Sequence, residues 1–159
     1  MTVINVSAGS EAVLELAVVG DLDTAANVLT TPQMQDITIN NSTGVFRFKT
    51  LDNTAESAVT TPATNQISLN IVVDETSFFG NAAATAKGLV IETGLFGVSK
   101  SKTKVAFRAY FNGTDTGSKY LEGAGFISGL SPTVNMDSPV WISPVTLEVD
   151  GDFTEGTVS

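Results

Sequence analysis

The chain has 159 residues, of which 42% are hydrophobic and 16% charged, so it has enough apolar material for one globular domain with its own core. Its 17 acidic and 8 basic residues give a formal net charge of −9, which disfavours nucleic-acid binding because that affinity comes mainly from Lys and Arg neutralising phosphates. The sequence has neither cysteine nor histidine, which excludes disulfides, thiolate metal sites and histidine-based catalysis.

Three short patterns in the first third of the chain predict strands, at residues 13–19, 36–39 and 45–49. Between the first two lies Asp21-Leu22-Asp23, whose carboxylates are a candidate contact for a divalent cation. A calcium loop needs about six or more oxygens and a glycine-paced pattern that is missing here. We therefore interpret this segment as a solvated turn.

The stretch from Thr50 to Asn65 is polar, small in its side chains and without periodicity, which predicts a long loop. Loops of this length inside a compact domain are uncommon and are usually functional or disordered. We interpret the stretch as an arm or contact loop. Its candidate contact residues are Asp52, Asn53, Thr54, Glu56, Thr60 and Thr61.

The middle of the chain predicts a strand and then one short helix. Residues 65–73 alternate between apolar and polar, and the apolar face carries Ile67, Leu69, Ile71 and Val73. The alanine-rich segment Asn81–Phe96 predicts the helix, with Asn81 as its N-cap, while Gly88 and Gly94 weaken it.

One basic cluster follows the predicted helix and comprises Lys100, Lys102 and Lys104. It could contact a phosphate, but a solvated connection and an intersubunit patch that meets an acidic neighbouring subunit are the main interpretations, and the sequence favours neither of these two.

Strand patterns dominate the last third. Residues 104–111 predict a strand with an inward face formed by Val105, Phe107, Ala109 and Phe111, and Asn112-Gly113 marks a turn after it. Residues 120–128 predict a strand interrupted by Gly123 and Gly125, which indicate a bulge or a close backbone approach.

The final segments are punctuated by proline. Pro139 and Pro144 bracket residues 140–143, which predicts an edge strand or a bent strand because proline cannot donate to a central ladder. We interpret the sole tryptophan, Trp141, as a core residue in preference to a ligand-binding platform. Residues 145–150 predict the last strand, with a turn at Asp150-Gly151.

No residues assemble into a recognisable catalytic site. Glu122 and Glu148 are isolated carboxylates within predicted strands, and no phosphate loop or dinucleotide fingerprint occurs. No apolar stretch approaches the roughly 20 residues that a membrane-spanning helix needs, so no membrane association is predicted. The sequence therefore predicts one mainly β domain over residues 1–159, a sandwich or barrel with one flanking helix, that is not an enzyme and uses no cofactor.

The C-terminal third also carries a pattern of short motifs: a glycine-rich strand at Gly123–Leu130, an Asp-Ser-Pro turn within Asp137–Val140, and a last strand over Val145–Thr154 that runs into Asp150-Gly151-Asp152. Together these resemble the end of the major tail tube proteins of long-tailed bacteriophages and related gene-transfer particles. The resemblance covers residues 104–154 most closely and extends to the order of elements along the whole chain.

The resemblance implies a subunit of hexameric rings that stack into a tube, with the inner sheets joined into a barrel around a lumen for DNA. It implies that the loop of residues 50–65 contacts the stacked ring, and that DNA passes the acidic subunit without specific binding. It further implies other tail proteins, such as the tape measure and tail terminator, as partners, and a location in the virion tail after synthesis in the host cytoplasm. An alternative is a non-polymerising module, such as a capsid decoration protein or an adhesin, that uses exposed loops and Trp141.

Overall fold

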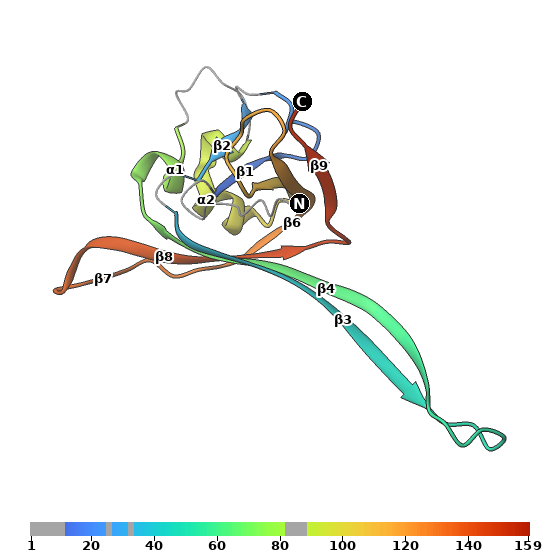
Figure 1. The fold of residues 1–159 in the computed structure, drawn as a ribbon. Helices are drawn as coiled ribbons and strands as arrows, with labels where there is room; N and C mark the ends of the chain where they lie inside the picture. The colour runs from blue at the N-terminus through green and yellow to red at the C-terminus, as the bar shows by residue number, and fades with distance from the viewer. Residues whose placement is uncertain (1–11, 25–26, 32–33, 82–88) are drawn as a thin grey trace, which may run out of the picture.

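The computed structural model describes residues 12–24, 27–31, 34–81 and 89–159. The chain is mainly β, as the alternation predicted (Figure 1). Along the described residues the elements are β1 (Val13–Val18), β2 (Leu29–Thr30), β3 (Met34–Phe48), β4 (Ser57–Val72), α1 (Glu75–Phe79), α2 (Leu89–Ser101), β5 (Val105–Tyr110), β6 (Lys119–Leu130), β7 (Thr133–Asn135), β8 (Ser138–Val149) and β9 (Thr154–Thr157).

The strands form one antiparallel sheet in the order β2-β1-β5-β6-β8-β4-β3, with β7 paired to β8 and β9 paired to β6. The long strand β6 joins the two halves of this sheet. Its ladder with β5 ends at the pair Val105↔Gly125, and its ladder with β8 begins at the pair Gly125↔Val149. Gly125 is therefore the position at which the β1-β5 half passes into the β8-β4-β3 half.

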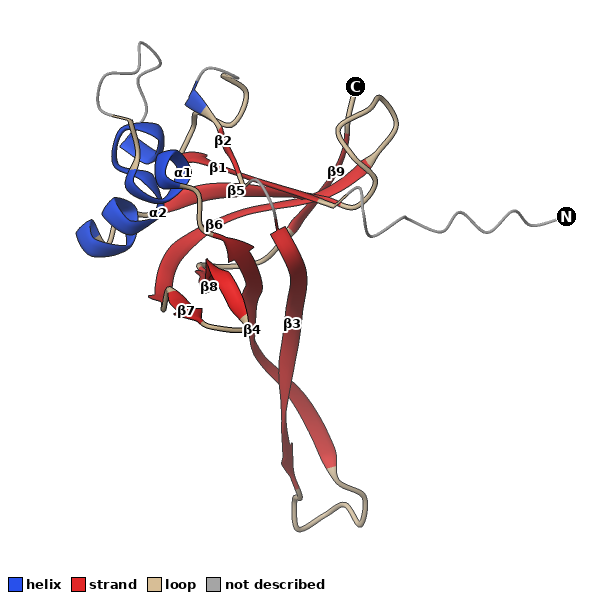
Figure 2. Cartoon of the chain, turned by 90° about the vertical axis from the view of Figure 1, so that its left-hand side faces the viewer, coloured by secondary structure: helices blue, strands red, loops and turns tan. Residues whose placement is uncertain are grey.

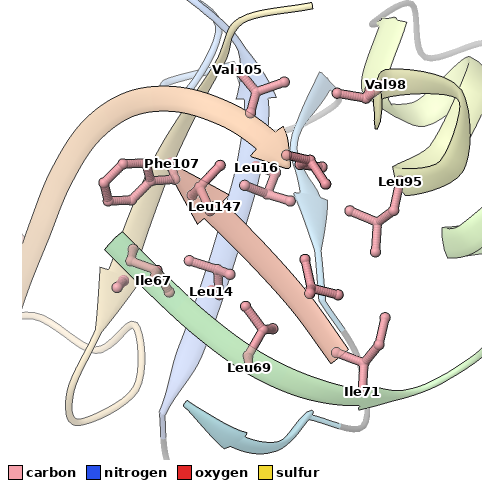
Figure 3. Packing of buried hydrophobic residues seen from close by; sticks show 13 residues of the cluster. Leu14, Leu16, Ile67, Leu69, Ile71, Leu95, Val98, Val105, Phe107 and Leu147 are labelled. Carbon is pink, nitrogen blue, oxygen red and sulfur yellow. The ribbon is translucent and has the colours of Figure 1, made fainter. Parts of the chain in front are cut away.

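Both halves of the sheet bury their inner faces in one core (Figure 3). Leu14 and Leu16 from β1 pack with Ile67 and Leu69 from β4, and Phe107 is fully buried between the halves. Helix α2 contributes Leu95 and Val98 to the same cluster. The alternation of apolar residues thus predicted this core correctly in β4, β5 and β8, because each of those strands has a face turned toward it.

Two predicted inward residues differ from the structure. Phe111 is exposed because β5 ends at Tyr110 and the chain has already entered the turn. Val73 lies just beyond the end of β4 and is only half-buried, although its N–H donates to the Trp141 carbonyl at 2.8 Å.

The predicted helix extends beyond its predicted end, and a second helix accompanies it. Residues 82–88, which include the whole alanine cluster, lie outside the described residues, and α2 continues past the predicted end at Phe96 to Ser101. The helix is interrupted at Gly94, whose φ of +67° favours glycine, and where a Cβ would meet the Phe78 carbonyl of α1 at 2.5 Å. Helix α1 was missed because it has five residues, although its N-cap Asp74 accepts a hydrogen bond from the Ser77 N–H at 3.0 Å.

The prediction of an edge or bent strand for residues 140–143 holds for residues 140 and 141 only. Strand β8 runs through both prolines; its ladder with β4 ends at Val72↔Ile142, so residues 138–141 are in a ladder with β7 alone, whereas residues 142–149 have β4 on one side and mainly β6 on the other. On the side of β8 opposite β4, the neighbouring strand changes from β6 to β7. Pro144 lies at this change, between the pairs Leu130↔Val145 and Thr133↔Ile142, where its missing N–H is tolerated.

Trp141 is not a core residue, because 53% of it is exposed. The glycine prediction in β6 is confirmed: a Cβ on Gly125 would collide with the Glu148 carbonyl, and one on Gly123 would lie 2.9 Å from the Phe107 ring. A register shift between Ile127 and Gly129 adds an irregularity to the same strand.

Candidate assembly surfaces

The carboxylates that were candidates for chemistry are engaged in structural pairs. Asp21 and Asp23 lie in the predicted turn after β1, and Asp23 binds Arg108 at 3.3 Å. Glu122 also binds Arg108, and Glu148 accepts a hydrogen bond from Gln66 at 2.7 Å. Within the described part of the chain no three Asp or Glu residues are grouped closely enough to hold a metal ion.

Arg108 organises the outer surface of the β1-β5 half. Its guanidinium lies 4.6 Å from the centre of the Tyr120 ring and pairs with Glu122 on the neighbouring strand β6. Burial opposes the charge, but interactions with Tyr110 and Glu122 outweigh it and raise the pKa of Arg108 above its ordinary value. The cation is therefore held by Glu122 and Tyr120 and also contacts Asp23, whose side chain is 91% exposed.

The other half of the sheet consists of β3, β4, β8 and the C-terminal part of β6 (Figures 1 and 2), and its outer face carries mainly polar side chains. Ile67 and Leu69 point into the core, so Gln66, Ser68 and Asn70 point outward. The charged residues in this half, taken over 34–43, 62–72, 126–130 and 142–149, are Asp36 and Glu148. Each carboxylate accepts a hydrogen bond from an amide on β4, Asp36 from Asn70 at 2.9 and 3.0 Å and Glu148 from Gln66.

Two strand edges of this half lack a partner strand among the described residues. Strand β3 pairs with β4 along one side only, and β6 beyond Gly125 pairs with β8 along one side only. The strands β3, β4, β8 and β6 alternate in direction, so the two open edges run in opposite senses. Open edges are templates for pairing with another chain, and a rotated copy would bring β3 antiparallel to β6 of its neighbour.

The prediction of a loop over residues 50–65 is wrong for about half of that stretch. Strand β4 begins at Ser57, so only residues 49–56 connect the strands, and the rest of the stretch pairs with β3. The two strands extend beyond the body as an arm (Figure 2). The predicted strands at 36–39 and 45–49 are one strand with a register shift between Thr43 and Val45.

The candidate contact residues divide between the tip of the arm and its strand. Asp52, Asn53, Thr54 and Glu56 lie in the connection, whereas Thr60 and Thr61 lie in β4, where Thr60 pairs with Val45. All six are exposed. The interpretation of the stretch as an arm is consistent with this arrangement, and the contact role of the six residues stays a prediction.

The arm carries an apolar face that sequence reasoning missed. Phe46 is in register with Val59, and the rings of Phe46 and Phe48 stack with their centres 6.2 Å apart. Phe46 is 61% exposed and Val59 53%, and we call Phe46, Phe48 and Val59 the arm stripe. The alternation Phe46-Arg47-Phe48-Lys49 was the available signal, since it gives a strand with one apolar face.

One of the three lysines in the predicted basic cluster forms an ion pair within the subunit. Lys104 binds Asp150 of the same chain at 2.7 Å, while Lys100 and Lys102 are exposed at the end of α2. An open hollow beside them is lined by Ser99, Lys102, Phe126, Ile127 and Ser128, next to the open edge of β6.

A second group of exposed apolar side chains lies on the hairpin of β7 and β8. We call Met136 and Trp141 the hairpin patch; Val134 and Val140 are also exposed, and Val140 points to the opposite face of β8 from Trp141. Met136 is 99% exposed at the turn. Among the described helices none is long and apolar enough to cross a membrane.

No protein-family model and no curated protein sequence matches this chain. Solved structures do match. The tail of an empty gene transfer agent particle, refined with C6 helical symmetry, matches at a TM-score of 0.65 and 9% identity over 96% of this chain and 100% of that one. The virion of the native gene transfer agent particle matches at 0.64 and 10% identity over 96% of this chain and 100% of the other.

The SPP1 tail tube, solved by solid-state NMR and cryo-EM, matches at 0.64 and 11% identity over 95% of this chain and 79% of that one. At these identities the likeness shows the fold. The chain therefore has the fold of tail tube subunits, which confirms the resemblance found in residues 104–154 at the level of structure.

Proposed function

We propose that this chain is the structural subunit of a phage-type tail tube and assembles into stacked hexameric rings around a channel for DNA. The observation that carries the proposal is the tail tube fold over 96% of the chain, combined with two open strand edges of opposite sense. The C6 symmetry of a similar tail supports six subunits in each ring. The subunit acts in assembly, in the virion tail, and has no catalytic role.

Rings close, in this proposal, when β3 of one subunit pairs with the C-terminal part of β6 of the next. This pairing satisfies the backbone groups that both edges leave open in the isolated subunit. Because the four strands alternate in direction, every junction is antiparallel and the rings acquire a continuous barrel.

The outward face of β3, β4, β8 and β6 then lines the channel. Over residues 34–43, 62–72, 126–130 and 142–149 its charges are those of Asp36 and Glu148. Amides and hydroxyls such as Gln66, Ser68 and Asn70 form much of the remaining face, together with the exposed ring of Phe126, which is in register with Glu148. Affinity for DNA depends on cations that displace counterions from phosphates. A channel without Lys or Arg therefore lets DNA pass without specific binding.

The arm provides the contact between stacked rings, through the tip residues that the sequence predicted and through the arm stripe. Lys100 and Lys102 are proposed to meet carboxylates of a neighbouring subunit, with Lys104 held by Asp150. A tape-measure protein in the channel and a tail terminator at the end of the tube are the further partners in this assignment.

A second candidate is a non-polymerising module, such as a capsid decoration protein or an adhesin. The exposure of Trp141 on a projecting hairpin favours it, because exposed aromatic residues are common at binding sites. The open edges of β3 and β6 favour the tube, since a module that works as a monomer gains nothing from them.

Light scattering of the purified protein over a range of concentrations, with electron microscopy of the same samples, separates the two candidates. The tube proposal predicts rings or tubes with a central channel at high concentration. A protein that stays monomeric at every concentration contradicts the tube and supports the module.

A further inference from the structure

The arm stripe and the hairpin patch lie at opposite ends of the same strands. The ladder of β4 with β8 runs from Val72↔Ile142 to Asn65↔Val149. The arm continues past the Asn65 end, and the β7-β8 hairpin continues past the Ile142 end. Figure 1 shows the two hairpins projecting from the body in opposite directions.

Both surfaces are apolar, and both are largely exposed in the isolated subunit. In the arm stripe Phe46 is 61% exposed, and Leu51 at the tip of the arm is fully exposed. In the hairpin patch Met136 is 99% and Trp141 53% exposed. Apolar groups clustered at a projecting end mark interaction sites, and aromatic residues are the usual anchors of such sites.

A stack of identical subunits requires two different surfaces on each chain, one that reaches out and one that receives. The arm stripe and the hairpin patch fulfil this requirement, since a subunit displaced along the strand direction brings the arm of one copy to the hairpin of another. An arm cannot reach the hairpin of its own chain, which lies at the other end of the sheet.

The charges allow this contact. The arm has balanced charge, with Arg47 and Lys49 against Asp52 and Glu56, in a chain whose net charge is −9. The receiving end carries Asp74, Glu75 and Asp137 and has no Lys or Arg among residues 72–81 and 131–146. The arm has no net charge, because its two cations balance its two carboxylates. It can therefore approach the acidic receiving end without the repulsion that two acidic surfaces would have.

We propose that the arm stripe of one subunit docks on the hairpin patch of a second copy in the adjacent ring, with Trp141 as the buried anchor. This inference rests on the proposed tube function and identifies which surfaces hold the rings together. The occupant of the hairpin patch is therefore the arm of the same protein.

The absence of cysteine from the chain makes a direct test possible. Variants Phe48→Cys and Met136→Cys are mixed, assembled and treated with a bismaleimide linker, and crosslinked peptides are identified by mass spectrometry. We expect a dimer that joins position 48 to position 136 and forms only when both variants are present. The matched control pairs Phe48→Cys with Thr114→Cys, an exposed position in the β5-β6 turn, and should give no such dimer.

Trp141 offers an independent readout because it is the sole tryptophan. Its fluorescence emission should shift to shorter wavelength on assembly, when the side chain leaves water. Phe46→Ser should abolish both the shift and the tubes while circular dichroism remains that of the folded subunit. Val45→Thr changes the opposite face of the arm at a residue that is 54% exposed, and should leave both intact.

Tubes that form without the crosslink and with the emission of an exposed tryptophan would overturn the docking assignment and leave the tube function standing. Failure of the unmodified protein to form rings or tubes at any concentration would overturn both.

Discussion

Glu148 on β8 lies in register with Gln66 on β4 and accepts a hydrogen bond from its side-chain amide at 2.7 Å. The pair places a carboxylate at the centre of the polar outer face, held by a neutral donor and without a cation. A neutral partner fixes the orientation of the carboxylate and leaves its charge uncompensated. This is the arrangement expected of a surface past which a polyanion moves.

Reversing this charge should convert the channel into a DNA-retaining surface. We expect Glu148→Lys to assemble into tubes that bind DNA, with binding that weakens steeply as salt increases, because each added cation releases counterions from phosphates. Retention of labelled DNA by purified tubes measures the effect. Asp115→Lys makes the same charge change in the exposed β5-β6 turn and should retain much less DNA; equal retention by both variants would contradict the channel assignment.

The close approach of β6 to β8 depends on a glycine. We expect Gly125→Ala to lower the free energy of unfolding by about 1–3 kcal/mol, because its methyl group would collide with the Glu148 carbonyl and force the two strands apart. Urea denaturation followed by circular dichroism measures this. Gly129→Ala is the matched control, since a Cβ there would make an ordinary contact with Thr146 at 3.8 Å; a similar loss from both would show that glycine matters here for another reason.

Tyr110 should make stability fall at high pH. Burial, together with the nearby Glu15 carboxylate, raises the pKa of Tyr110 above its ordinary value of about 10. Because the pKa is raised in the folded state, the tyrosine of the unfolded chain loses its proton first as the pH rises. The contribution of Tyr110 to the free energy of unfolding is therefore fully present below about pH 10 and is lost as the pH rises further. Denaturation as a function of pH should show this decline, and Tyr110→Phe should remove part of it. A decline of unchanged size in that variant would contradict the prediction.

Shortening the arm should separate ring formation from stacking. Deletion of residues 45–60 removes the arm stripe and the tip but leaves the ladder of β3 with β4 intact up to Thr43↔Ala63, with Gly44 available for a tight turn. The subunit should fold and form single rings, because the edges of β3 and β6 remain. Electron microscopy would show rings without tubes; tubes of normal length from this variant would exclude the arm from stacking.

The sequence predicted the parts of the fold in which one face of a strand is buried. Ile67, Leu69 and Ile71 alternate with polar residues because they face a core, and period two is visible only under that condition. The distal arm has both faces in solvent in the isolated subunit, so Thr60 and Thr61 carry no alternation and their strand was taken for a loop. The pairing of such a segment is set by its partner strand, which no local pattern reveals.

The sequence indicated what kinds of feature the candidate surfaces contain, but not where those features lie in the fold. The glycines of β6 indicated a close approach, but not that the opposing backbone belongs to Glu148. Trp141 was expected in the core because large aromatic residues usually are buried, whereas the hairpin that carries it projects from the body. In the proposed tube these apolar residues would be buried against a second copy of the chain, although they are exposed in a single subunit.

Cryo-electron microscopy of the concentrated, purified protein tests the central claim most directly. The account predicts a hollow tube of stacked six-fold rings, with the channel lined by the outer face of β3, β4, β8 and β6 and with Glu148 directed into it. A protein that yields only monomers, or a tube whose channel is lined by the Arg108 surface of the opposite half, would contradict the account.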